Sequence, residues 1–120
     1  MSNQVKGKSG EKTAEKFLKK KGCKVLHRNY KTNLGEIDLI VFDKDTLVFV
    51  EVKSRSGTLF GTPAEAVTHF KRTKINQVAA QFLTRQSMRD VPVRFDVVEV
   101  YLNEGRVEHI ENAFDSYLRY

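Results

Sequence analysis

The stretch from Gly35 to Lys53, GEIDLIVFDKDTLVFVEVK, constrains the fold of this chain most, because it places charged residues inside strand-like apolar runs. The two runs cover residues 36–42 and 46–53, and the polar residues Asp43-Lys44-Asp45 between them predict a tight turn. A hydrophobic core rejects ionisable side chains, since removing a charge from water is costly. The charges therefore indicate a functional site on a hairpin.

The register of this hairpin decides whether the charges meet. Side chains alternate along a strand, so Glu36 and Asp38 share one face, and Glu51 and Lys53 share a face of the next strand. A two-residue loop at Lys44-Asp45 places Asp38 opposite Glu51. The same register places Glu36 opposite Lys53. A loop that is one residue longer or shorter sends the two sets to opposite faces.

Three carboxylates and an ammonium on one patch suit a particular chemistry. Clustered carboxylates repel one another unless a cation neutralises them, and oxygen ligands on rigid strands suit Mg²⁺ or Mn²⁺. A nearby lysine can reach a scissile phosphate or an attacking water, which completes the minimal set for metal-assisted phosphodiester hydrolysis. The alternative is a solvated hairpin in which Glu36–Lys53 and Glu51–Lys53 are ordinary charge pairs.

Length and composition favour a single domain over residues 1–120 that acts in the cytoplasm. The chain is 40% hydrophobic and 30% charged, which is typical of globular proteins. It has no apolar stretch long enough to cross a bilayer and no secretory signal, so we expect no membrane partner. Cys23 is the single cysteine, which excludes an internal disulfide and is compatible with a reducing compartment.

The net charge of +6 is concentrated in the first 31 residues, where basic residues far outnumber acidic ones. This excess predicts a phosphate-contacting surface at the N-terminal end, with salt-dependent binding to nucleic acid. The alternative is a solvated helix face that only keeps the protein soluble. The lysines concerned are Lys6, Lys8, Lys12, Lys16, Lys19, Lys20, Lys21 and Lys24.

A helix is predicted over residues 10–21, with Ser9 as its N-cap and Gly22 as its stop. Glu11 then falls in the first turn, where the helix dipole favours a carboxylate, although its side chain could equally project toward the metal patch. Residues 23–30 read as a strand.

The second half predicts a helix and two strands. The helix starts at Thr62-Pro63-Ala64-Glu65 and continues to Leu83, with a possible break near Thr68-His69. Its polar side carries Lys71, Arg72 and Lys74 as candidate contacts to a nucleic-acid backbone. Residues 93–102 form a strand with one wetter face, and residues 106–110 form the last strand. The tail over residues 111–120 is amphipathic and its structure is left open. The pattern indicates an α/β fold around one mixed sheet.

This order of elements and the Asp38, Glu51-Val52-Lys53 constellation resemble the PD-(D/E)XK nuclease superfamily, which has the restriction-endonuclease-like fold. More closely, the chain resembles the YraN-like family of small uncharacterised bacterial proteins, related to archaeal Holliday junction resolvases. The matching residues are Gly7, Gly10, Glu11, Ala14, Arg28-Asn29-Tyr30, residues 35–40 and 49–53, Arg55, Gly61, Pro63, Glu65-Ala66-Val67, Lys71 and Arg94-Phe95-Asp96. The resemblance implies a central mixed sheet flanked by helices in the order αβββαββ.

The resemblance also implies a role for each site residue. Asp38 and Glu51 would hold Mg²⁺ or Mn²⁺ with the Val52 carbonyl, and Glu11 would complete the metal shell. Glu36 would support these ligands or act as a further one. Lys53 would position or deprotonate the attacking water. The residues expected to contact nucleic acid are Lys8, Lys12, Arg28, Arg55, Lys71 and Arg72.

Two functions are compatible with the sequence. The first is a metal-dependent endonuclease that acts on branched or unusual DNA, with DNA favoured over RNA, and that forms a homodimer because a two-fold-symmetric junction needs two sites. The second is a non-catalytic module that binds nucleic acid or a protein partner and keeps a vestigial nuclease site.

Overall fold

The order of helices and strands is the one that the sequence predicts. The computed structural model describes residues 3–55 and 68–115, with side chains from residue 9 onward. The elements are α1 (Asn3–Lys20), β1 (Lys24–Thr32), β2 (Gly35–Asp43), β3 (Thr46–Arg55), α2 (His69–Arg85), β4 (Val93–Tyr101) and β5 (Arg106–Ile110). Among these residues, no helix is both long and apolar enough to cross a membrane.

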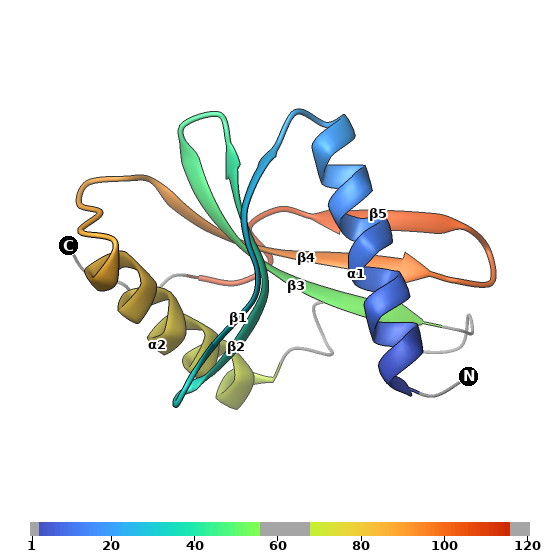
Figure 1. Cartoon of the computed structure of the whole chain (residues 1–120), viewed down its shortest axis with the longest axis horizontal. Coiled ribbons are helices and arrows are strands. Elements are labelled where there is room, and N and C mark those ends of the chain that lie inside the picture. The colour runs from blue at the N-terminus through green and yellow to red at the C-terminus, as the bar shows by residue number, and fades with distance from the viewer. Residues whose placement is uncertain (1–2, 56–67, 116–120) are drawn as a thin grey trace.

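The strands form one mixed five-stranded sheet in the order β1-β2-β3-β4-β5. β3 and β4 are parallel, and the other neighbours are antiparallel. Parallel neighbours need a crossover connection, and the connection between β3 and β4 contains α2. Figure 1 shows α1 and α2 on opposite sides of the sheet. The expected α/β fold, a mixed sheet flanked by helices, is therefore confirmed.

Each helix covers its own core. On one face, Ala14 and Leu18 of α1 pack with valines of β3 and β4 such as Val50 and Val98. On the other face, α2 contributes Phe82, whose ring lies edge-on to Phe49 with ring centroids 5.9 Å apart. Because both faces of β3 are covered, a charged side chain on this strand can reach solvent only near the strand's end.

The first helix begins earlier than its sequence signals suggest. α1 starts at Asn3, so Ser9 lies inside the helix, where its carbonyl accepts a hydrogen bond from Thr13 Oγ1 at 3.0 Å. The following residue, Gly10, packs closely on β3, where an added Cβ would overlap the Ser54 hydroxyl. Glu11 therefore lies near the middle of α1 and not in its first turn. The helix dipole does not explain a carboxylate at this position.

The start of α2 resolves the predicted break. Thr68 is the N-cap, and its hydroxyl accepts a hydrogen bond from the Lys71 backbone N–H at 3.2 Å. The predicted helix start at residues 62–65 lies outside the described residues. The break expected near Thr68-His69 thus coincides with the beginning of α2.

The prediction of a wetter face on β4 is wrong. Asp96 and Glu99 are both fully buried, because both faces of β4 are covered and contribute residues to a hydrophobic core. The Asp96 carboxylate accepts hydrogen bonds from the Arg94 side chain, His109 Nε2 and the Asn112 backbone N–H. Buried charge is tolerated when it is paired and hydrogen-bonded in this way.

The beginning of the tail is part of the fold. Phe114 stacks on Phe95 of β4 with ring centroids 5.1 Å apart, and the Ala113 backbone N–H donates to the Phe95 carbonyl. These contacts fasten residues 111–115 to the face of the sheet that α2 covers.

Candidate functional site

The site forms where β2 and β3 separate. The ladder between them runs from Asp43 opposite Thr46 to Leu39 opposite Val50, so the loop has the two residues Lys44-Asp45 and the predicted register is correct. Lys44 adopts a left-handed φ of 56° to make this tight turn.

The ladder stops at Asp38, which lies one step beyond Leu39. Its carboxylate accepts a hydrogen bond from the Val52 backbone N–H at 2.8 Å, so a side chain replaces the strand's backbone as partner. Asp38 therefore lies at a fork between two diverging strands.

Beyond the fork, the predicted pairing of Glu36 with Lys53 is wrong. The first residues of β2 are paired with β1 alone, and there Glu36 lies opposite Lys31. The Glu36 carboxylate is 3.7 Å from Lys31 Nζ. The register count fails here because β2 leaves β3 at Asp38.

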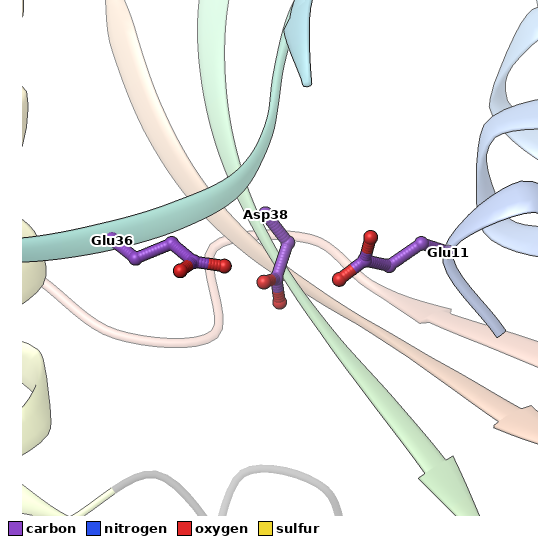
Figure 2. Close-up of side chains that lie close together, drawn as sticks. All are labelled: Glu11, Glu36 and Asp38. Carbon is purple, nitrogen blue, oxygen red and sulfur yellow. The ribbon is translucent and has the colours of Figure 1, made fainter. Parts of the chain in front are cut away.

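Three carboxylates converge at the fork. Glu11, Glu36 and Asp38 each offer an oxygen, and these oxygens lie within 4.8 Å of one another. Figure 2 shows Asp38 between the other two, with Glu36 approaching along β2 and Glu11 from α1. The expectation that Glu11 reaches the patch from the first helix is therefore met by the geometry.

The carboxylates are held in a place that disfavours their charge. Burial raises the pKa of Asp38 to about 7, and the charge of Glu51 adds to the shift despite the opposing hydrogen bond from Val52 N–H. Burial likewise raises the pKa of Glu11, against a hydrogen bond from Asn29 that lowers it. A divalent cation would remove this repulsion.

Two lysines approach Glu51 from the other side of the fork. The residue Glu51 is 7% exposed. Its carboxylate oxygen Oε1 lies 2.5 Å from Lys71 Nζ and 3.5 Å from Lys53 Nζ. Burial and the neighbouring Lys71 lower the pKa of Lys53. Burial also opposes the charge of Lys71, but the hydrogen bonds to Glu51 and Lys53, with the charges of Glu51 and Asp38, together outweigh it and raise the pKa of Lys71. The pKa values of the two lysines are thus shifted in opposite directions.

The residues present fit the expected metal. Oxygen donors that are crowded, partly buried and close enough to share one ion are the set that Mg²⁺ or Mn²⁺ requires. The alternative of ordinary surface charge pairs accounts for the Glu51–Lys53 contact. It does not account for the convergence of Glu11, Glu36 and Asp38.

A cleft of about 370 Å³ opens beside these groups. Its lining includes Leu34, Gly35, Glu36, Asp38, Glu51, Phe70, Lys71, Lys74 and Ile75. Lys74 is one of the basic residues that the sequence places on the polar side of this helix, whereas Phe70 is a member of the site that the sequence did not predict. One signal was available, because Phe70 falls outside the apolar stripe of Ile75, Val78 and Phe82 on a helical projection.

A smaller hollow of about 210 Å³ lies on the other side of Glu11, and Lys12, Arg28 and Asn29 contribute to its lining. Arg28 is exposed, and its guanidinium already donates to both oxygens of Glu15, at 2.6 and 2.9 Å. Hydrogen bonds from Arg28 and Lys19 lower the pKa of Glu15 to about 2. Lys12 is exposed.

The remaining predicted nucleic-acid contacts are dispersed. Arg55 Nε donates to the fully buried Glu99 at 2.5 Å, and the Arg72 guanidinium lies over the Phe114 ring at 5.6 Å from its centroid. The Lys8 side chain lies outside the described residues. Of the six predicted contacts, the structure brings Lys71 to the carboxylates and leaves Lys12 and Arg28 at the neighbouring hollow.

Comparisons with known proteins identify the family. The model of uncharacterised protein family UPF0102 matches residues 10–100. A UPF0102 protein of Clostridioides difficile (strain 630) is 49% identical over 114 residues, covering 95% of this chain and 100% of the relative. Another from Alkaliphilus oremlandii (strain OhILAs) is 48% identical over 116 residues, covering 93% and 99%.

One solved structure, that of Pyrococcus furiosus SfsA in complex with Ca²⁺, is similar over 92% of this chain and 64% of that chain, at 17% identity and a TM-score of 0.36. A likeness of this size does not bear on the chemistry of the site. The match of the family model and the two relatives confirm the resemblance that the sequence shows: the chain belongs to the uncharacterised protein family UPF0102, the YraN-like family.

Proposed function

We propose that this chain forms a single nuclease domain that acts in the cytoplasm as a metal-dependent endonuclease, hydrolysing phosphodiester bonds in branched or unusual DNA. The observation that carries the proposal is the fork at Asp38, where a partly buried carboxylate is crowded by Glu11 and Glu36 beside the lysine of a Glu51-Val52-Lys53 run. Such crowding costs stability, so a role in function explains it better than a role in folding.

Each residue of the site has a task in this proposal. Asp38, Glu11 and Glu36 would hold Mg²⁺ or Mn²⁺, with Glu51 and the Val52 carbonyl beside them, and the bound ion would supply Lewis-acid stabilisation of the phosphate's charge. Lys53 Nζ would position the attacking water or accept its proton, and burial lowers the pKa of Lys53 in the direction that the second role needs. Lys71 would keep its charge and offset the negative charge that grows on the phosphate.

The charge of the chain supports a nucleic-acid substrate. The net charge is +6, and Lys12 and Lys16 lie exposed on α1, close in sequence to Glu11. Lysines placed beside acidic metal ligands attract the phosphate backbone that the ligands alone would repel. We expect two copies to act on a two-fold-symmetric junction, because one site cuts one strand.

The test is cleavage of a labelled panel of a four-way junction, a flap, single strand, duplex and RNA, with Mg²⁺, Mn²⁺ or EDTA. We expect metal-dependent cutting by the wild type and a loss of at least about a hundredfold in Lys53→Ala, within the range by which general acid–base groups accelerate reactions. The matched control is Lys44→Ala, which removes an exposed lysine at the β2–β3 turn, at the opposite end of these strands from the fork. Cutting by Lys53→Ala at the wild-type rate would contradict the proposal.

The alternative, a non-catalytic binding module, has one observation in its favour. Lys71 and Lys53 already neutralise Glu51, so this carboxylate is satisfied by protein groups alone. A module of this kind would bind nucleic acid equally well with EDTA and after Asp38→Asn, and it would cut nothing on the panel.

A further inference from the structure

Phe70 is the large hydrophobic side chain that the described part of the chain leaves exposed, at 71% of its surface. It lies in the first turn of α2, on the side of the helix away from the buried residues Ile75, Val78 and Phe82. Single exposed apolar residues are common on protein surfaces and need no explanation by themselves. What distinguishes Phe70 is its position.

Phe70 lines the same cleft as Asp38 and Glu51. The next residue, Lys71, contacts Glu51, so the aromatic ring is one position along the helix from the charged centre of the site. Lys74, one helical turn further on, holds its Nζ 5.5 Å from the centroid of the Phe70 ring. The cleft therefore presents a flat apolar group between two ammonium groups and a cluster of carboxylates.

This combination matches one class of ligand better than others. A nucleic-acid strand has phosphates for the lysines and a planar base for the ring, and base–aromatic stacking is tolerant of sequence. Bases inside a duplex already stack on their neighbours, so Phe70 can reach a base only where the strand is unpaired or the base is splayed out. A protein partner would bury Phe70 without needing the two lysines beside it.

We propose that Phe70 stacks on an unpaired base next to the scissile phosphodiester, so that the DNA substrate carries an unpaired nucleotide at the cut. This inference rests on the proposed nuclease function and narrows its substrate. The ring fixes the strand by its base, and Lys71 and Lys74 contact the phosphates on either side. Duplex DNA without an unpaired base lacks this contact.

The test detects base stacking by fluorescence, under conditions without metal in which no cleavage is expected. The adenine analogue 2-aminopurine, whose fluorescence falls on stacking, is placed at one unpaired position at the branch point of a flap DNA, and at a paired position in a matched duplex. Binding is followed in EDTA with the wild type, Phe70→Ala, Phe70→Tyr and Phe70→Leu. Because Phe70 is exposed, all three variants should fold, which thermal unfolding checks.

The wild type should quench the unpaired probe and leave the paired probe unchanged. Phe70→Ala should lose the quenching and bind the flap about tenfold more weakly, given the value of one stacked base. Phe70→Tyr keeps the ring and should behave as the wild type, whereas Phe70→Leu keeps the apolar bulk and should lose the quenching. Equal affinity of Phe70→Ala and wild type, or equal quenching by Phe70→Leu and Phe70→Tyr, would overturn the inference.

Failure of this inference is separable from failure of the nuclease function. Quenching that depends on the Phe70 ring, in a protein that cuts nothing with Mg²⁺ or Mn²⁺, would support the base contact and contradict the nuclease. Metal-dependent cleavage without such quenching would overturn the base contact alone.

Discussion

Asp38 shows how one residue can set the geometry of a site at the expense of stability. Its carboxylate caps the Val52 N–H at the strand fork while it lies among Glu11, Glu36 and Glu51. The single hydrogen bond could be made as well by an amide oxygen. The negative charge is therefore what a purely structural account leaves unexplained, and the destabilisation it causes is typical of functional sites.

Replacement of Asp38 by Asn should make the metal-free protein more stable. The amide oxygen can still accept the Val52 N–H, but the repulsion with the neighbouring carboxylates is gone. We expect the urea midpoint at pH 8 in EDTA to rise above that of the wild type, with an increase of about 1 kcal/mol in the free energy of unfolding. A midpoint well below that of the wild type would mean that the charge itself holds the fork together.

For Asp96 we predict the opposite effect of replacement by Asn, because its charge is paired and hydrogen-bonded. Burial alone would raise its pKa, but hydrogen bonds from His109, Arg94 and the Asn112 N–H hold the pKa below its usual value. Asp96→Asn should cost about 3 kcal/mol near neutral pH, since Arg94 and His109 lose their buried partner.

The stability difference between the wild type and Asp96→Asn should depend on pH. A depressed carboxylate pKa stabilises the fold above the ordinary pKa of about 3.9, and that stabilisation is lost as the pH falls further. The difference between wild type and Asp96→Asn should therefore shrink below about pH 4. Asp90→Asn is the control, because Asp90 is exposed and its left-handed φ of 57° suits asparagine. A difference that stays constant down to pH 2 would contradict the ion-pair explanation.

At the scale of elements, the contact between α1 and β3 places Glu11 at the fork. Gly10 allows this contact, because a Cβ there would overlap the Ser54 Oγ and lie 3.1 Å from the Ser54 Cβ. Glu11 is the next residue on the helix, so its position beside Asp38 depends on how closely α1 approaches the strand.

Gly10→Ala should therefore weaken the metal site without unfolding the protein. The clash moves α1 outward and Glu11 with it, so we expect Mn²⁺ affinity to fall about tenfold. Adding Ser54→Ala removes the clashing hydroxyl, and the double variant should recover most of the affinity. The decisive comparison is made by Mn²⁺ titration of the two single variants and the double variant. If Gly10→Ala binds Mn²⁺ like the wild type, Glu11 does not depend on this contact.

Much of the element arrangement could be predicted because the signals are local. The register of β2 on β3 follows from the length of the loop at Lys44-Asp45, and the N-cap at Thr68 coincides with a break in helical periodicity. The point where β2 leaves β3 could not be counted, because it depends on the Asp38 side chain competing with backbone groups for the Val52 N–H.

Other wrong predictions concern residues whose environment is set by parts of the chain that are distant in sequence. A pattern of alternation treats Asp96 as exposed, whereas its partner His109 comes from another strand and makes burial possible. The local cap signal at Ser9 does not set the start of α1, because the helix extends back to Asn3. Among the candidate site residues, the carboxylates could be predicted from spacing and family resemblance, but Phe70 gains its meaning only from the cleft it lines.

At the scale of the whole molecule, the positive charge and the acidic site complement each other. Lys12 and Lys16 are exposed on α1, and Lys12 lies at the hollow that contains Glu11. Phosphate contacts of this kind release counterions, so each contributes about 0.9 to the slope of log affinity against log salt.

Binding of a labelled flap DNA in EDTA should therefore become less salt-dependent when both lysines are removed. We expect Lys12→Ala/Lys16→Ala to lower the slope by about 2. Lys44→Ala, at the far end of the hairpin, should leave the slope unchanged. An unchanged slope in the double variant would show that this surface of α1 does not contact the strand.

The proposed function requires the carboxylates at the strand fork to form a divalent-metal centre. Titration of the protein with Mn²⁺, followed by the electron paramagnetic resonance signal of free Mn²⁺, tests it without any assumption about the substrate. We expect one site per chain that Asp38→Asn weakens by at least about tenfold, while Glu104→Gln, on the exposed β4–β5 turn, binds like the wild type. Equal Mn²⁺ affinity of Asp38→Asn and the wild type would contradict the assignment of the site.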